Sequence, residues 1–131
     1  LEQQGEPDSP AALKQHRCLQ YGYSGSLHQW RLTGPDGERA WPIACVMWSN
    51  NGETLKTAAT LGQGIALLPT FIAGEALQSG ALRTVLADYP PAALVLSALY
   101  PRHRHLSAKV RLFVELLEDR FGGRPYWDLV A

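Results

Sequence analysis

The chain has 131 residues, of which 46% are hydrophobic and 18% are charged, and its formal net charge at pH 7 is zero. This length suits one globular unit with a single core and leaves no room for two large domains. The zero charge argues against binding nucleic acid through a broad basic surface, and no apolar run reaches the roughly 18 residues of a membrane span.

Clear turn residues separate the first elements of the chain. Ser9 before Pro10 is typical of a helix start and predicts a short helix that ends near His16. A strand is predicted next, at Arg17–Tyr21. Two further strands flank a Gly-Pro-Asp-Gly turn, which predicts a β-hairpin over residues 30–41.

The middle of the chain alternates between strands and helices. Ala44–Ser49 is predicted to be a buried strand, and from Glu53 the spacing of apolar residues becomes helical. Ile65–Leu68 is a continuous apolar strand, after which Pro69 begins a helix that stops at Gly80. This alternation predicts the α/β class with a mainly parallel sheet, and we expect the hairpin to make that sheet mixed.

The last third of the chain predicts two strands, at Leu82–Leu86 and Leu94–Tyr100, and a long helix at Ser107–Phe121. The helix has a broad apolar face and a separate apolar strip formed by Leu112 and Leu116. One interpretation docks this helix on the sheet of its own domain. The other places it against a partner domain or subunit that lies outside this chain.

The residue types that carry catalysis or bind metals form no recognisable constellation. Cys18 and Cys45 lie far apart in the sequence, each within an apolar strand, so we interpret them as buried structural thiols in preference to redox sensors. His103 and His105 follow a proline, and a solvated turn is favoured there over a metal or anion site. We therefore predict no enzymatic activity, no metal and no cofactor.

Polar residues follow the predicted strand at Ala44–Ser49. Asn50 and Asn51 stand where the strand ends and a helix begins, and free N–H groups at a helix start favour an anion or a carboxylate. A helix N-cap is the alternative role for either asparagine. Ligands of open α/β sheets bind beyond the carboxyl ends of strands, where Tyr21–Ser26 also lies. The sequence therefore predicts half of a polar small-molecule cleft.

Short motifs occur in a fixed order along nearly the whole chain. They are Leu1–Gly5 with Pro7 and Pro10, Leu13, His16–Leu19, Trp30 with the Gly34–Gly37 turn, Asn50–Glu53, Ala58–Ala59, Leu61–Pro69, Gly80–Leu82, Val85–Leu86, Leu99–Pro101 and Leu106–Phe113. In this order they resemble the effector-binding region of LysR-type transcriptional regulators, namely its second regulatory subdomain and the final return into the first.

The resemblance implies a type II periplasmic-binding-protein-like fold, in which a small molecule binds between two α/β subdomains. It assigns residues 1–8 to the end of a crossover segment, residues 9–93 to the second regulatory subdomain, and residues 94–131 to the hinge return strand and C-terminal helix of the first. It further implies a cytoplasmic homo-oligomer without membrane contact, which reaches DNA only through an N-terminal domain that is absent from this chain.

The same resemblance implies a set of effector-binding positions at strand ends and near the hinge. They are Tyr21, Tyr23, Ser24, Ser49, Asn50, Asn51, Gly52, Thr54, Gly64, Ile65 and Tyr100. We expect the effector to be an organic acid or another small anion. The alternative function is the solute-binding lobe of a transporter, against which the lack of a secretory signal in the polar first eight residues argues.

Overall fold

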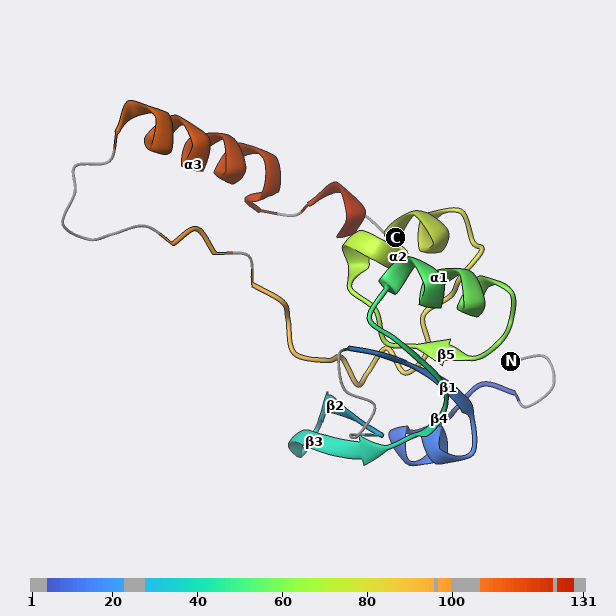
Figure 1. Cartoon of the computed structure of the whole chain (residues 1–131). Helices are drawn as coiled ribbons and strands as arrows, with labels where there is room; N and C mark the ends of the chain where they lie inside the picture. The colour runs from blue at the N-terminus through green and yellow to red at the C-terminus, as the bar shows by residue number, and fades with distance from the viewer. Residues whose placement is uncertain (1–4, 23–27, 96, 100–106, 124, 129–131) are drawn as a thin grey trace.

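The core of the molecule is a small parallel sheet. Figure 1 shows the computed structural model of the chain, in which residues 5–22, 28–95, 97–99, 107–123 and 125–128 are described. Three parallel strands lie side by side in the order β4 (Ala44–Ser49), β1 (Arg17–Tyr21) and β5 (Ile65–Ala66). The predicted α/β class with a mainly parallel sheet is confirmed.

The register of the sheet brings the carboxyl ends of two strands together. Tyr21 at the end of β1 lies opposite Ser49 at the end of β4. At the other end of β1, Cys18 lies between Cys45 of β4 and Ile65 of β5. The backbone N–H of Gly22 donates to the carbonyl of Ser49 over 3.1 Å, which holds the two strand ends side by side.

The hairpin consists of β2 (Gln29–Gly34) and β3 (Gly37–Pro42), as predicted. It does not make the parallel sheet mixed, because its two strands form a separate sheet. Trp30 and Leu32 are buried in the same apolar cluster as Cys18, so the hairpin packs on the face of the parallel sheet instead of pairing with its edge. The predicted first helix is a 3₁₀ helix, η1 (Pro10–Lys14).

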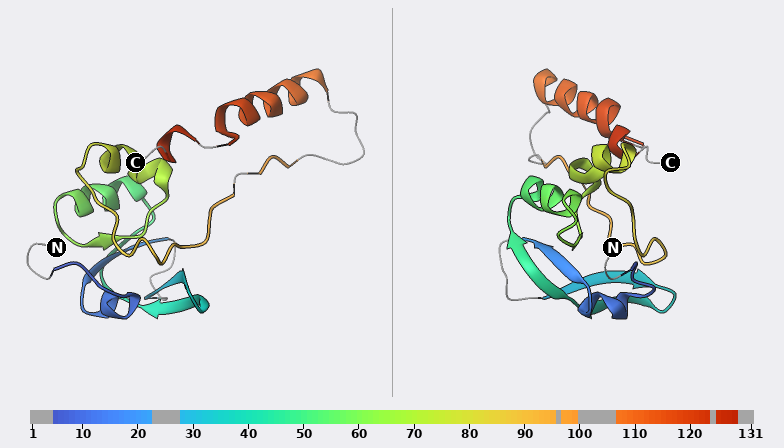
Figure 2. Two further views of the ribbon diagram at one scale, coloured as in Figure 1. Left: turned by 180° about the vertical axis from the view of Figure 1, so that it is seen from behind. Right: turned by 90° about the vertical axis from the view of Figure 1, so that its right-hand side faces the viewer.

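One helix, α1 (Gly52–Thr60), covers the opposite face of the parallel sheet (Figure 2). The next helix, α2 (Thr70–Gln78), packs on α1. Leu19 of β1 and Leu55 of α1 are fully buried against each other in a second apolar cluster, which also contains Ala58. The parallel sheet therefore lies between α1 on one side and the hairpin with η1 on the other.

The prediction of a strand at Leu82–Leu86 is wrong. No residue of this segment is in a strand, and Leu86 has a φ of 54°, which breaks an extended conformation. Leu86 and Tyr89 still pack against the cluster around Cys18, and the N–H of Thr33 donates to the carbonyl of Pro90 over 2.8 Å. The apolar pattern thus reflects burial of side chains and not a paired backbone.

Two other strand predictions differ from the structure. The described residues of Leu94–Tyr100 are exposed and lie outside any strand, and Ile65–Leu68 shortens to the two residues of β5. A strand needs a neighbouring backbone for its N–H and C=O groups. Within the described part of the chain, β5 pairs with β1 on one side and with no strand on its other side. The described residues of Leu94–Tyr100 pair with no strand at all.

The long C-terminal helix is confirmed as α3 (Ala108–Phe121), and the Ser107 hydroxyl caps it by accepting a hydrogen bond from the N–H of Val110 over 3.4 Å. α3 stands away from the body of the molecule (Figures 1 and 2) and buries none of its residues. Docking of this helix on its own sheet is therefore not what the structure shows. No helix among the described residues is long and apolar enough to cross a membrane.

Candidate functional site

The carboxyl ends of β1 and β4 form a polar edge together with the start of α1. Ser49 is half-buried at the end of β4, and the side chains of Tyr21 and Asn50 are exposed beside it. α1 begins three residues after the end of β4, at Gly52. Of the predicted site residues, the structure brings together Tyr21, Ser49, Asn50, Asn51, Gly52 and Thr54 at this edge.

The two asparagines of this edge have different roles. Asn51 is the N-cap of α1, and its Oδ1 accepts hydrogen bonds from the N–H groups of Glu53 and Thr54 over 3.0 and 3.3 Å. The Ser49 hydroxyl accepts from the N–H of Asn51 over 3.0 Å, which fixes the turn into the helix. The N-cap interpretation is therefore confirmed for Asn51. Asn50 is exposed and takes no part in this capping network.

We predict that Asn51→Ala lowers the free energy of unfolding by about 1 kcal/mol, because two N–H groups at the start of α1 lose their acceptor. Asn51→Asp keeps an acceptor at the N-cap and should stay near the wild-type value. Urea denaturation of both variants checks this. An unchanged midpoint for Asn51→Ala would show that the cap adds nothing to stability.

The first turn of α2 also belongs to this edge, and it was missed in the sequence. α2 begins at Thr70 with Pro69 as its N-cap and without a side-chain cap. Ile72 packs so closely on Gly52 that any Cβ there would collide with its Cδ1, so the first turns of α1 and α2 touch. The signal was Pro69 directly after an apolar strand, which marks a second strand-to-helix junction at the same end of the sheet.

The structure does not bring the remaining predicted site residues to this edge. Ile65 pairs with Cys18 near the start of β1, at the far end of the sheet from Tyr21. Gly64 precedes it, next to Gln63, whose carbonyl accepts a hydrogen bond from Arg17 Nε over 2.9 Å. The other three predicted positions, Tyr23, Ser24 and Tyr100, lie outside the described residues.

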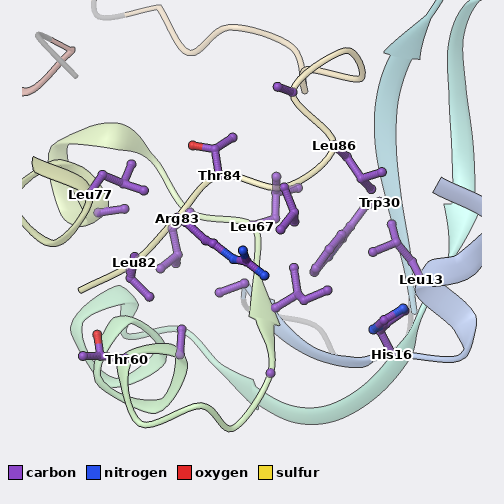
Figure 3. Close-up of a pocket in the computed structure, with 18 of the residues that line it drawn as sticks. Leu13, His16, Trp30, Thr60, Leu67, Leu77, Leu82, Arg83, Thr84 and Leu86 are labelled. Carbon is purple, nitrogen blue, oxygen red and sulfur yellow. The ribbon is translucent and has the colours of Figure 1, made fainter. Parts of the chain in front are cut away.

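Gly64 and Ile65 instead line a broad groove of about 1180 Å³, in which apolar side chains stand beside the charged or polar ones of His16, Arg17 and Arg83 (Figure 3). Its walls come from η1 and the hairpin on one side and from α2 and residues 80–91 on the other, with Trp30 and Leu77 facing across it. Small-molecule pockets usually enclose about 300–1,000 Å³. This groove is larger and open, and it runs along β5. Thr70 at the start of α2 lines it, whereas none of the polar edge residues from Ser49 to Thr54 does.

The chemistry of the two cysteines favours a structural role for Cys18. Its thiol is buried, and burial raises its pKa to about 12, with a further increase from Cys45 and a decrease from a backbone hydrogen bond at Ala44. A neutral thiol is a poor nucleophile. Cys45 is only half-buried. In the described part of the chain, no three His, Cys, Asp or Glu residues lie close enough to hold a metal ion.

Comparison with known proteins agrees with this architecture. The model of the LysR substrate binding domain matches residues 1–122. An HTH-type transcriptional regulator from Xanthomonas campestris pv. campestris is 32% identical over 124 residues, which is 92% of this chain and 36% of that protein. A second HTH-type regulator, from Haemophilus influenzae, is 34% identical over 110 residues, covering 84% of this chain and 38% of the relative.

A solved structure gives the same result in three dimensions. The regulatory domain of CrgA, a LysR-type transcriptional regulator from Neisseria meningitidis, superposes with a TM-score of 0.66 at 25% identity, covering 91% of this chain and 58% of that one. The predicted type II periplasmic-binding-protein-like fold is thereby confirmed. The chain spans less than half of the two sequence relatives. The chain thus belongs to the LysR substrate-binding domain family.

Proposed function

We propose that this chain is the effector-sensing region of a bacterial transcription regulator of the LysR type. The observation that carries the proposal is the family match over residues 1–122, which includes every described residue of the polar edge. The relatives are transcriptional regulators, which favours this function over a transporter lobe or an enzyme. We propose that DNA is bound by another part of a cytoplasmic homo-oligomer, since this chain is neutral.

The proposed effector site is the polar edge, consisting of Tyr21, Ser49, Asn50, Gly52, Thr54 and Thr70, with Asn51 as the cap that shapes it. Tyr23, Ser24 and Tyr100 stay in the proposal on the family resemblance. Gly64 and Ile65 are left out because they lie at the far end of β5. We propose a small anionic effector such as an organic acid, because the positive ends of two helix dipoles meet at this edge and α2 has no side-chain cap.

The division of the chain follows from the same proposal. We propose that residues 9–93 form one regulatory subdomain, that residues 1–8 lead into it, and that residues 94–131, apart from the contact of η2 (Tyr126–Asp128) with α2, belong with a first subdomain supplied by the rest of the protein. The exposed apolar side chains of α3 support this assignment, with Leu112, Phe113 and Leu116 each about 60% exposed. The effector would favour the arrangement of the two subdomains to which it binds more tightly.

The experiment uses a full-length regulator that contains this chain. A thermal-shift screen of simple mono- and dicarboxylates identifies a ligand, and calorimetry then measures its affinity for the wild type and for Asn50→Ala. We predict that Asn50→Ala weakens binding by roughly tenfold, the value of one lost hydrogen bond to a charged group. The melting temperature without ligand should not change, because Asn50 is exposed and outside the capping network.

Glu75→Ala is the matched control, since Glu75 is exposed on α2. It should bind the same carboxylate with wild-type affinity. Wild-type affinity in Asn50→Ala, with the carboxylate still bound, would remove the polar edge as the effector site. A regulator that no small molecule stabilises or binds would contradict the sensing function itself.

A further inference from the structure

The described C-terminal end of the chain returns to the body and packs on α2. η2 (Tyr126–Asp128) is in contact with α2, whereas α3, which precedes η2, extends away from the sheet (Figures 1 and 2). Since α3 buries no residue of its own, its position depends on the segments at its two ends. The contact of η2 with α2 is one of these attachments.

The contact is made through the backbone at a glycine. Gly74 is buried in the middle of α2, and a Cβ built at this position would lie 2.6 Å from the carbonyl oxygen of Trp127 and 3.2 Å from its Cβ. Such a distance to a backbone oxygen is too short for any side chain. Glycine is also the least favourable residue in a helix interior apart from proline. Its presence in α2 therefore suits the close approach of η2.

The segment between α3 and η2 is shaped to make this return. α3 ends at Phe121, and Gly123 has a φ of 74°, which turns the chain back. The rings of Phe121 and Trp127 then pack with their centroids 5.5 Å apart and their planes at 40°. The N–H of Asp128 donates to the carbonyl of Pro125 over 2.9 Å and closes the turn of η2. α2, η2 and the end of α3 are thus joined by consecutive contacts.

We propose that residues 125–128 form a clasp on α2 of the same chain, that Gly74 is the position that accepts the clasp, and that the clasp sets where α3 stands. α2 starts at Thr70, one helical turn before Gly74, so the clasp lies one turn from the polar edge. A link between effector binding and the position of α3 follows from this closeness. That consequence rests on the proposed function, whereas the clasp itself does not.

The test is a double-mutant cycle in urea denaturation, with two chain lengths and two residues at position 74. The chains are the whole one and one that ends at Gly123. Both carry Leu112→Glu and Leu116→Glu, which put charges on the exposed face of α3 and keep the chain monomeric. In the shortened chain, Gly74→Ala should lower the unfolding equilibrium constant roughly fivefold, because Ala favours the helix. In the whole chain, the Cβ displaces η2, so the constant should stay unchanged or rise.

Glu75→Ala, next to Gly74 and exposed, is the control and should have the same effect at both lengths. Hydrogen exchange gives a readout that needs no substitution at Gly74, and the amides of residues 72–78 should exchange several-fold faster in the chain that ends at Gly123 than in the whole chain. If Gly74→Ala lowers the unfolding equilibrium constant by the same factor at both chain lengths, and the amides of residues 72–78 exchange at the same rate in both, the clasp is overturned. The same cycle is then repeated without Leu112→Glu and Leu116→Glu. Coupling between chain length and position 74 that appears only in this second cycle would place the contact between two copies of the chain and overturn the clasp as well.

Discussion

Leu19→Ala should lower the free energy of unfolding by about 2–5 kcal/mol, the usual cost of emptying a fully buried leucine site. Leu19 has no exposed surface and lies on the central strand β1. Its side chain fills the space between the sheet and α1, where it packs with Leu55 and Ala58. Because the small sheet has three strands, little else can close the cavity. Urea or thermal denaturation of the 131-residue chain measures the loss.

Leu94→Ala removes the same atoms from a side chain that is 75% exposed, and it should change stability by less than about 0.5 kcal/mol. The comparison of Leu19→Ala with Leu94→Ala separates the cost of lost packing in the core from any effect that replacing leucine with alanine has at an exposed position. Equal effects of the two substitutions would mean that the interface between β1 and α1 is not the core of the molecule.

The exposed apolar face of α3 should make the isolated 131-residue chain self-associate in a concentration-dependent way. Leu112, Phe113 and Leu116 are 61%, 60% and 61% exposed on a helix that the described residues leave uncovered. Apolar surface of this extent favours burial against another surface. Leu112→Glu combined with Leu116→Glu should restore the monomer mass in light scattering.

Arg111→Glu together with Glu115→Arg is the control, because it exchanges an exposed ion pair on the same helix without changing the apolar face. This variant should associate as the wild type does. A wild-type chain that remains monomeric, with α3 amides that exchange as in a solvated helix, would contradict the interpretation that α3 needs a partner.

Elements with strong local signals were predictable from the sequence. The bounds of β1 and β4 and the hairpin around its Gly-Pro-Asp-Gly turn agree with the structure, and so does α3 after the cap residue Ser107. In each case a few neighbouring residues determine the conformation. The parallel sheet was predictable as a class because helices separate its strands along the chain.

Features that depend on distant partners were not predictable. Leu86 and Tyr89 are apolar because they cover the core, and only the fold shows that their backbone has no strand to pair with. The hairpin has the composition of a sheet strand pair, but its buried Trp30 and Leu32 direct it onto the face of the sheet. Sequence periodicity reports which side chains are buried, not which backbones are adjacent.

The same reason explains the outcome at the site. Asn51 was one of two candidate caps in the sequence, and only the hydrogen bonds of Oδ1 distinguish it from Asn50. Gly64 and Ile65 were predicted from the family resemblance alone, but Gly64 precedes β5 and Ile65 begins it, at the end of the strand opposite to the one where ligands of such sheets bind. The first turn of α2, which begins at Thr70, comes close to α1 through a contact between Gly52 and Ile72. No local sequence pattern predicts this contact.

Hydrogen exchange on the full-length regulator, with and without the carboxylate found in the screen, tests the effector site most directly. We predict slower exchange in the ligand-bound state at residues 49–55, which form the end of β4 and the start of α1 at the polar edge and do not line the groove. Residues 60–64 and 80–87, which line the groove, should not change. Protection of the groove with no change at the polar edge would contradict the account and move the effector site to the other end of the sheet.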